Sequence, residues 1–368
     1  MRKILSATAA ITMGMALAAC ADGGSSDNGG GEPADVSAAE TYLAPMLENP
    51  TSINIDEPLS KKPEEGKLIV GLNSGIPSAN VLASAWKQAA EDLGWEYKEV
   101  NSGASPEDQQ KAMDSALQMD PDGIATSGIP ISTIQTQLED AEAQGIWVNT
   151  SASADAPSGA MYDTSIAGPA QLNEWGKMVA AQVVTESEGS AKIQLFNLPV
   201  FPILLEFDKG FKSAIEEWCP GCDLKENAQQ ATDIGTNTPG AVVSALQAAP
   251  DTDWVVFDLA ELGIGVQAAL EGAQLNTANI GGLSALPENF EALKGDTQDA
   301  WTAYPLPIVG YRQIDSFARQ FNGDPLVEAL LPTQLATPDT VDNLVFEGDN
   351  YVGVADYREQ FKALWLVS

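Results

Sequence analysis

The chain has 368 residues, of which 52 are acidic and 18 basic, for a formal net charge of −34 at pH 7. Such acidity disfavours nucleic acid as a partner, because phosphate contacts need a basic surface. The sequence contains no histidine, which excludes histidine-based catalysis, histidine metal sites and Ser-His-Asp triads. A high-salt habitat and a generally acidic exported surface would both fit this composition.

The first twenty residues predict an export signal. A charged start, Met1-Arg2-Lys3, precedes a short apolar run and then Leu17-Ala18-Ala19-Cys20. The apolar run is too short to span a bilayer as a helix. The ending resembles the bacterial lipobox, which implies removal of residues 1–19 and acylation of Cys20. The alternative is an ordinary secretory signal with an incidental cysteine. We expect a mature protein tethered by lipid to the extracytoplasmic face of the cell membrane.

Residues 20–65 are expected to link this anchor to the folded body. Ala21–Ala39 is rich in Gly, Ser, Asp and Asn and has almost nothing to bury, which predicts a flexible leash. Glu40–Glu65 gains Leu, Ile and Pro without a clear period, which indicates a partly ordered arm. The body then runs from Lys67 to Ser368, long enough for two lobes with separate cores.

A first series of strands and helices begins at Lys67. Lys67–Leu72 is a continuous apolar run, typical of a strand buried on both faces. Ser105-Pro106-Glu107-Asp108 predicts a helix start, with an N-cap residue, a proline and two acids. The expected elements are strand Lys67–Leu72, helix Ser78–Leu93, strand Trp95–Val100, helix Ser105–Met119, strand Gly123–Ser127, helix Ile131–Ala143 and strand Gly145–Thr150.

A second series follows a break near Ser153–Gly168. It opens with a long helical run, and Asp253–Asp258 reads as a buried strand. The expected elements are helix Ala170–Glu186, strand Ala191–Asn197, helix Leu205–Trp218, strand Asp223–Asn227, helix Thr238–Ala249, strand Asp253–Asp258, helix Gly263–Gly272, strand Asn279–Leu283, helix Pro287–Leu293, strand Ala300–Tyr304 and helix Ile308–Phe321, with a short tail after it.

This alternation predicts an α/β fold of two doubly wound parallel-sheet lobes. Strands separated by helices form right-handed βαβ units and hence parallel sheets. Ligands bind such sheets beyond the carboxyl ends of the strands. Two lobes of this kind would form a cleft that can close on a solute.

The two remaining cysteines lie in Trp218-Cys219-Pro220-Gly221-Cys222. A disulfide between Cys219 and Cys222, closing the turn after a helix, suits an exported chain and a Pro-Gly turn. A thioredoxin-like redox pair would open a helix, whereas this motif follows one. Half of a metal site would need a second pair of ligands.

In the order and spacing of several segments the chain resembles the type I, ribose-binding-like class of periplasmic binding proteins, which deliver solutes to ABC importers. The segments that carry the resemblance are Lys67–Leu72 with Pro77 after it, Asp122–Ser127, Gly145–Val148, Lys209-Gly210-Phe211, Asn279–Leu283, Thr340–Leu344 and Tyr357–Trp365. The resemblance implies three crossings between lobes that act as a hinge. Lobe one would be residues 67–160 with 306–335, and lobe two residues 161–305 with 336–368.

The resemblance also implies a function. The protein would be a monomer that captures a small-molecule ligand, uses no cofactor or metal, and hands the ligand to an importer permease with its ATPase. A tethered sensor of the same fold is an alternative that sequence features do not separate from a transporter. An exported enzyme is a further alternative, but no nucleophile elbow, P-loop or dinucleotide fingerprint is found.

Several departures from the sugar-binding members concern the ligand. The two aromatic residues expected after the first loop's proline are Ser78 and Ala79 here, and Leu205 stands where the family has an arginine. Ala152-Ser153 replaces an Asp-Arg pair, Gly282-Leu283-Ser284 a Gly-Phe-Asp, and Tyr304 a glutamine. Because paired hydroxyl groups need such partners, we do not expect an aldopentose or aldohexose held in the usual manner.

The candidate ligand-binding residues mix apolar side chains with a few hydroxyl and amide groups. They are Asn73, Ser74, Ile76, Asn80, Ser127, Thr150 and Ser151 in lobe one, and Asp163, Asn197, Phe201, Leu205, Asp258, Glu261, Ser284, Trp301 and Tyr304 in lobe two and the crossings. The apolar members suggest an apolar body for the ligand.

Each polar or aromatic candidate also has a structural interpretation. Asp163, Asp258 and Glu261 could pair with a cationic group, but an Asp after a strand commonly caps a helix or accepts a backbone N–H. Trp301 and Tyr304 could simply pack in a core. Asn197 could orient the ligand or satisfy its own loop.

Overall fold

The computed structural model describes residues 36–103, 105–275 and 278–367. The expected signal, the acylated Cys20 and most of the leash lie outside the described residues. Within them, local sequence signals place most elements correctly. The apolar run at Lys67 forms β1 (Leu68–Asn73), and Ser105 caps α3 (Pro106–Leu117) by accepting a 3.1 Å hydrogen bond from the Asp108 N–H.

The first sheet has five parallel strands in the order β2-β1-β3-β4-β5. Its connections are α2 (Pro77–Asp92), α3 and α4 (Gln135–Gln144). The helix expected over Ile131–Ala143 is interrupted at Ile134, whose φ of −118° is not helical, so a short 3-10 turn precedes α4. The remaining strands are β2 (Glu96–Asn101), β3 (Gly123–Ser127), β4 (Trp147–Ser151) and β5 (Met161–Asp163).

The second sheet has six strands in the order β11-β10-β9-β8-β6-β7, parallel except for β11, which runs antiparallel to β10. Its strands are β6 (Lys192–Asn197), β7 (Asp223–Ala228), β8 (Trp254–Phe257), β9 (Asn279–Gly282), β10 (Ala300–Ala303) and β11 (Gln334–Ala336). Its helices are α5 (Pro169–Glu186), α6 (Leu204–Trp218), α7 (Thr238–Ala248), α8 (Val266–Ala273) and α9 (Pro287–Lys294). A helix was expected to start at Gly263, but Gly265 has φ +79°, which is not helical, so α8 starts at Val266.

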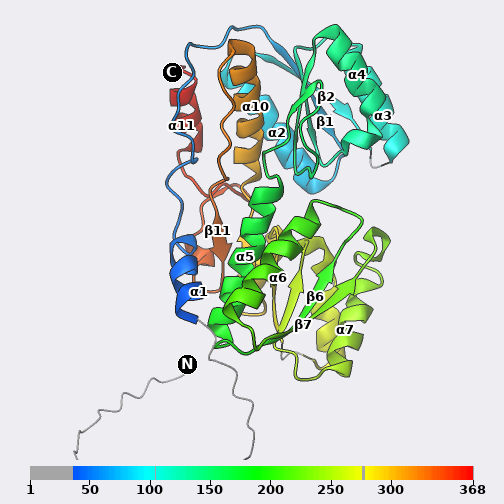
Figure 1. Ribbon diagram of the computed structural model, residues 1–368, viewed down its shortest axis with the longest axis vertical. Coiled ribbons are helices and arrows are strands. Elements are labelled where there is room, and N and C mark those ends of the chain that lie inside the picture. The colour runs from blue at the N-terminus through cyan, green and yellow to red at the C-terminus, as the bar shows by residue number, and fades with distance from the viewer. Residues whose placement is uncertain (1–35, 104, 276–277, 368) are drawn as a thin grey trace, which may run out of the picture. The chain divides into compact units, whose positions relative to one another are not determined.

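The chain crosses between the sheets three times. It passes from β5 to α5, from β10 to α10 (Leu306–Asn322), and from α10 to β11. In Figure 1, α10 lies beside α2 in the upper half of the view, whereas α5 and α6 lie with β6 and β7 in the lower half. The prediction of two doubly wound lobes with a three-crossing hinge is therefore confirmed.

The expected lobe boundaries differ from the structure in three places. Strand β11 pairs with β10 in the second sheet, although residues up to 335 were expected in lobe one. Strand β5 pairs with β4 in the first sheet, so lobe one extends to Asp163 and does not end at Ala160. The expected tail folds into a hairpin, β12 (Phe346–Glu347) with β13 (Asn350–Tyr351), and helix α11 (Tyr357–Leu364). Helix α11 packs against α10 and thus against lobe one, although the whole tail was expected in lobe two.

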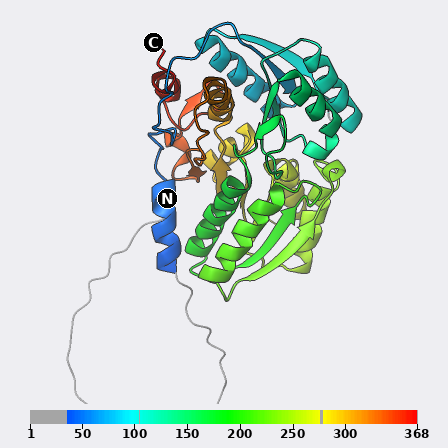
Figure 2. The same ribbon diagram turned by 45° about the horizontal axis from the view of Figure 1, so that its top comes forward.

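The amino-terminal arm is ordered along its described length, and here the expectation of a flexible leash up to Ala39 is wrong. Helix α1 (Val36–Leu43) packs on α5, and Ala39 is fully buried. The chain then continues beside α11, where Leu59 N donates to Leu364 O at 2.9 Å, and on to the first lobe (Figures 1 and 2). A few apolar side chains, among them Ile53 and Leu59, give the arm enough buried surface to fold.

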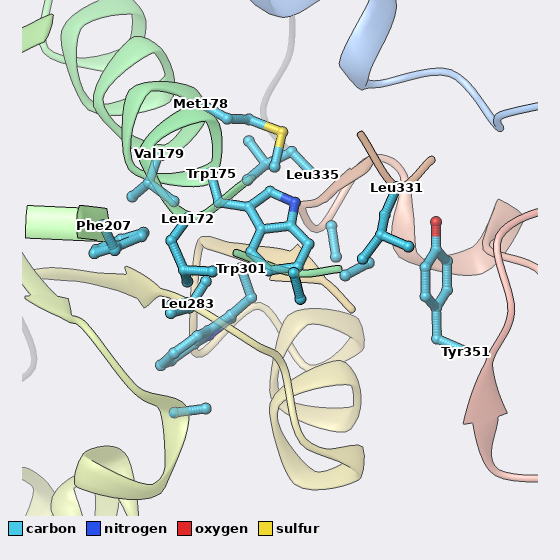
Figure 3. Close-up of a cluster of buried hydrophobic side chains, with 14 of the residues drawn as sticks. Leu172, Trp175, Met178, Val179, Phe207, Leu283, Trp301, Leu331, Leu335 and Tyr351 are labelled. Carbon is cyan, nitrogen blue, oxygen red and sulfur yellow. The ribbon is translucent and has the colours of Figure 1, made fainter. Parts of the chain in front are cut away.

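The core of lobe two lies between α5, α6 and the second sheet, as Figure 3 shows around Trp175. Helices α5 and α6 approach closely at two glycines. A Cβ on Gly176 would lie 2.1 Å from Phe207 O, and one on Gly210 would lie 2.0 Å from Asn173 O. In lobe one the buried ion pair of Asp315 with Arg319 also binds the arm, because Arg319 Nη2 donates to Glu57 O at 2.7 Å.

Candidate functional site

The sequence-predicted site residues lie at or near the carboxyl ends of the parallel strands of both sheets. In doubly wound sheets these ends are where ligands bind, because each strand there gives way to a loop and a helix start. The structure places Asn73, Ser127, Ser151, Asp163 and Asn197 as the last residues of β1, β3, β4, β5 and β6.

In lobe one, Asn73 organises the loop after β1. Its Nδ2 donates to Asn80 Oδ1 at 2.9 Å and to Glu99 Oε1 at 3.1 Å, and its Oδ1 accepts from Gly75 N at 2.8 Å. All the polar atoms of the side chain are therefore engaged by protein. Ser74 is partly exposed in this loop and Ile76 is largely exposed.

The hydroxyl groups after β3 and β4 form a pair. Ser151 Oγ donates to Ser127 Oγ at 3.0 Å, and Ser127 keeps some exposed surface. Thr150 is fully buried, and its Oγ1 donates to the Ser151 carbonyl at 3.2 Å. Of the three, Ser127 is the side chain that reaches solvent at this edge.

Asp163, at the first crossing, is buried and held by serines. Its Oδ1 accepts from Ser165 N and Oγ, and its Oδ2 accepts from Ser316 Oγ of α10 at 2.6 Å. The bond from Ser316 joins the end of β5 to α10, and the bond from Ser165 N is the kind that the structural interpretation of this carboxylate expects.

Lobe two repeats the asparagine arrangement of lobe one. Asn197 Nδ2 donates to Glu226 Oε2 on the edge strand β7 at 3.2 Å and to Asp208 Oδ2 on α6 at 2.7 Å. In both lobes the first strand thus ends in an asparagine held by a glutamate of the neighbouring edge strand. Asn197 Oδ1 and Asp208 Oδ1 are buried without a partner among the described residues.

Three carboxylates of lobe two have raised pKa values. Burial raises the pKa of Asp208 to about 6. Burial also raises the pKa of Asp258 well above its usual range, with a smaller contribution from the charge of Asp208, although Leu198 N donates to Asp258 Oδ2 at 2.8 Å. The pKa of Glu261 is raised, again chiefly by burial.

Two of the aromatic candidates, Trp301 and Tyr304, pack in the core of lobe two. Trp301 is fully buried in this core (Figure 3). Its ring is stacked on Phe257 with centroids 6.2 Å apart, and its Nε1 donates to Gln298 Oε1 at 2.8 Å. Tyr304 meets Trp175 edge-on, with centroids 5.0 Å apart, and burial raises its pKa. Both observations favour the packing interpretation. Ser284 follows β9 in the left-handed region, with φ +67°, and its N–H is bound by Thr302 Oγ1.

Exposed apolar side chains gather in the connection after β6. Phe201 and Leu205 are 42% and 40% exposed, and their neighbour Val200, which the sequence reasoning missed, is 64% exposed. Ile264, after β8, was also missed. An isolated apolar residue in a loop gives no sequence signal of its exposure, because loops also place apolar residues in cores.

The polar partners Glu99, Asp208 and Glu226 were missed as well. Glu99 and Glu226 lie on edge strands whose pairing with β1 and β6 is a tertiary fact, and Asp208 lies in the second turn of α6. The disulfide expected from the sequence is formed: Cys219 and Cys222 are joined, with Cα atoms 5.3 Å apart, just after α6.

Two further observations bound the chemistry of the described residues. No helix among them is long and apolar enough to cross a membrane, and no three of their acidic or cysteine side chains gather closely enough to hold a metal ion.

A hollow of about 370 Å³ opens at the amino-terminal ends of the strands of the second sheet, opposite their carboxyl ends. It is lined by Glu186, Asp253, Trp254 and Asn279 among others. It is acidic and lies away from the carboxyl ends where this fold binds ligands.

The two doubly wound lobes, their three crossings and the side chains at the strand ends define the class of two-lobed α/β binding proteins. The chain belongs to the family described as "periplasmic binding protein domain", whose model matches residues 69–325. This is a family of binding proteins and not of enzymes. No curated protein matches the chain.

Solved structures share the fold at low sequence identity. The glucose-galactose binding protein GanP from Geobacillus stearothermophilus is 18% identical with a TM-score of 0.64, covering 75% of this chain and 99% of its own. A solute binding protein from Agrobacterium vitis with bound allitol is 21% identical, with TM-score 0.65 and coverages of 76% and 98%. A 5-methylthioribose transporter solute binding protein from Thermotoga lettingae is 16% identical, with TM-score 0.66 and coverages of 84% and 99%.

Proposed function

We propose that this chain is an extracytoplasmic solute-binding lipoprotein. It captures a small organic ligand between its lobes and delivers it to the permease and ATPase of an ABC importer. The observation that carries the proposal is the pair of parallel sheets joined by three crossings, in a chain of the periplasmic binding protein family. Such a hinge lets the lobes close over a ligand, and the permease can bind the closed form in preference to the open one.

The export signal supports the location. An acyl group on Cys20 would anchor the protein to the extracytoplasmic face of the membrane, with residues 21–35 between the anchor and α1. Replacing Cys20 with alanine should move the protein from the membrane fraction to the medium or periplasm, whereas Ser25→Ala should leave it in the membrane fraction. A Cys20→Ala protein that still fractionates with membranes would contradict the anchor.

The ligands of the similar structures support a small organic solute. Allitol and 5-methylthioribose are both small hydroxylated molecules, and the latter also carries an apolar methylthio group. By the family resemblance, Ser78 and Ala79 correspond to the usual ring-stacking aromatics, and Leu205 lies near the position of an arginine. We therefore propose a ligand that is not held as an ordinary pentose or hexose.

Thermal unfolding tests the binding function. A ligand that binds only the folded protein raises the melting temperature according to RT ln(1 + [L]/Kd). The mature protein should be screened with ribose, arabinose, glucose, allitol and 5-methylthioribose, and small-angle scattering should show the lobes closing with any compound that stabilises it. Stabilisation by ribose, arabinose and glucose alone would contradict the proposed ligand type. Turnover of a bound compound would contradict the binding function itself.

A further inference from the structure

The connections at the carboxyl ends of the strands lack basic side chains in the described part of the chain. Among the described residues, none of the connections that leave β1 to β10 at their carboxyl ends contains a Lys or Arg. The same connections contain four carboxylates: Asp155, Asp233, Asp258 and Glu261. Lysines do lie at the amino ends, where Lys67 precedes β1 and Lys192 begins β6.

The cations on α6, the helix that follows β6, are already paired. Lys209 Nζ lies 3.2 Å from Glu206 Oε2, and Lys212 Nζ lies 3.0 Å from Glu226 Oε1. Glu226 also binds Asn197, so Lys212 belongs to the asparagine arrangement of lobe two. Two glutamates thus compete with any ligand for these ammonium groups.

An anionic ligand would therefore be poorly bound at these ends. A buried carboxylate or phosphate needs a charged partner or several N–H donors to offset its desolvation, and the strongest such partner is the fork of an arginine. The net charge of −34 adds a repulsive field around the whole molecule. Neutral or cationic ligands meet neither obstacle.

The same edge exposes apolar surface. Of the nine large apolar side chains that are exposed among the described residues, five lie in these connections or in the first turn of α6. Single exposed apolar residues are ordinary, but such a concentration at the binding edge of the fold indicates a contact surface. The five are Ile76, Val200, Phe201, Leu205 and Ile264.

Neutral polar groups complete this edge. Ser74 and Ser127 keep exposed surface, and α2 begins here without a side-chain cap. The start of α6 is different, because Leu204 N and Glu206 N already donate to the backbone carbonyls of Phe201 and Ile203. The serine hydroxyls and the uncapped start of α2 suit the hydroxyl or carbonyl oxygens of an uncharged ligand.

We infer that the ligand carries no net negative charge and presents an apolar part to Phe201 and Leu205 in lobe two and to Ile76 in lobe one. The inference rests on the proposed binding function and names the class of solute: a neutral or cationic organic molecule with both hydroxyl or carbonyl groups and an apolar portion. Sugar acids, sugar phosphates and other carboxylates are excluded from the class.

Yeast extract serves as the first probe, because it contains solutes of every charge. The full chain is dialysed to equilibrium against the extract, washed and denatured, and the released solutes are identified by mass spectrometry in both ion polarities. We expect enrichment of a neutral or cationic compound with an apolar portion. Enrichment of a carboxylate, a phosphate or a fully hydroxylated sugar would overturn the inference and leave the binding function standing. Enrichment of nothing would remove the binding function and the inference with it.

Substitutions then locate the apolar contact. With the enriched compound, calorimetry should show about tenfold weaker binding for Phe201→Ala and for Leu205→Ala. The matched control is Met119→Ala, because Met119 is similarly exposed but lies after α3, at the amino-terminal edge of the first sheet. Unchanged affinity in both Phe201→Ala and Leu205→Ala would overturn the assignment of the apolar contact.

Discussion

Asn73 and Asn197 show how single residues prepare the strand ends. Each is the last residue of the first strand in its lobe, and each donates from its amide to a glutamate of the adjacent edge strand. Because carboxylates only accept, these bonds fix which end of each amide is the oxygen. The amide groups of both asparagines are therefore held by the protein, and in our proposal exposed neighbours such as Phe201 contact the ligand instead.

The carboxyl of Asp208 allows a pH prediction. Its pKa is raised by burial from 3.8 to about 6 in the folded protein, so the folded state binds this proton more tightly than the unfolded state. Its contribution to stability is then fully present below pH 3.8 and is lost as the pH rises through 6, which amounts to about 3 kcal/mol at neutral pH. Asp208→Asn should remove this loss.

Urea unfolding of wild type and Asp208→Asn at pH 4.5 and pH 7.5 measures the effect. The variant should gain stability relative to wild type between the two pH values. Asp251→Asn is the control, because Asp251 is exposed and Lys192 lowers its pKa, so it should show no such gain. An equal difference between wild type and Asp208→Asn at both pH values would contradict the raised pKa.

At the scale of elements, the packing of α5 on α6 depends on two glycines. A methyl group at Gly176 would lie 2.1 Å from the backbone oxygen of Phe207, so Gly176→Ala must push the helices apart. We expect a loss of about 3 kcal/mol in the free energy of unfolding. Gly240→Ala in α7 is the matched control: nothing lies within 4 Å of its Cβ, and it should be neutral or slightly stabilising. Equal effects of the two substitutions would disprove the close approach.

The amino-terminal arm is an element that contacts both lobes. Its helix α1 packs on α5, and Leu59 is buried beside α11 near lobe one. Leu59→Ala should lower the free energy of unfolding by about 3 kcal/mol. Leu330→Ala is the control. Leu330 also lies beside the arm, because its backbone carbonyl accepts a hydrogen bond from Asn54, but its side chain is exposed, so the substitution should change stability little. A Leu59→Ala protein as stable as wild type would mean that the arm is not part of the folded body.

At the scale of the whole molecule, the charge dominates. Of the eleven salt bridges among the described residues, five join two exposed side chains, and in the whole chain 52 acidic residues face 18 basic ones. Self-repulsion of this kind destabilises the compact state and is screened by salt, whose Debye length falls to about 10 Å at 0.1 M. The melting temperature should therefore rise with sodium chloride from about 0.01 M to about 0.5 M.

The control for screening is sucrose. An uncharged osmolyte stabilises without screening, so sucrose should raise the melting temperature equally at low and high salt. A melting temperature that does not change, or that falls, over the same range of sodium chloride would show that self-repulsion contributes little.

The sequence by itself determined the elements and the class of fold. Apolar periods and helix-start signals such as Ser105-Pro106 act between near neighbours, so strands and helices of both lobes could be located to within a few residues. The strand ends, and with them the candidate residues, follow directly from those boundaries. The helical arm at Val36 and the fold of the tail after Ala336 escaped this reasoning, because their order comes from packing against distant helices.

The tertiary structure alone decided what each candidate side chain does. Asp163 binds Ser316, Asn197 binds Asp208 and Glu226, and Trp301 stacks on Phe257 in the core. Whether a residue at a strand end is a core residue or an exposed one depends on which strand lies beside it and which helix covers it. Pairing between segments far apart in the chain sets both, and no local pattern of residues records that pairing.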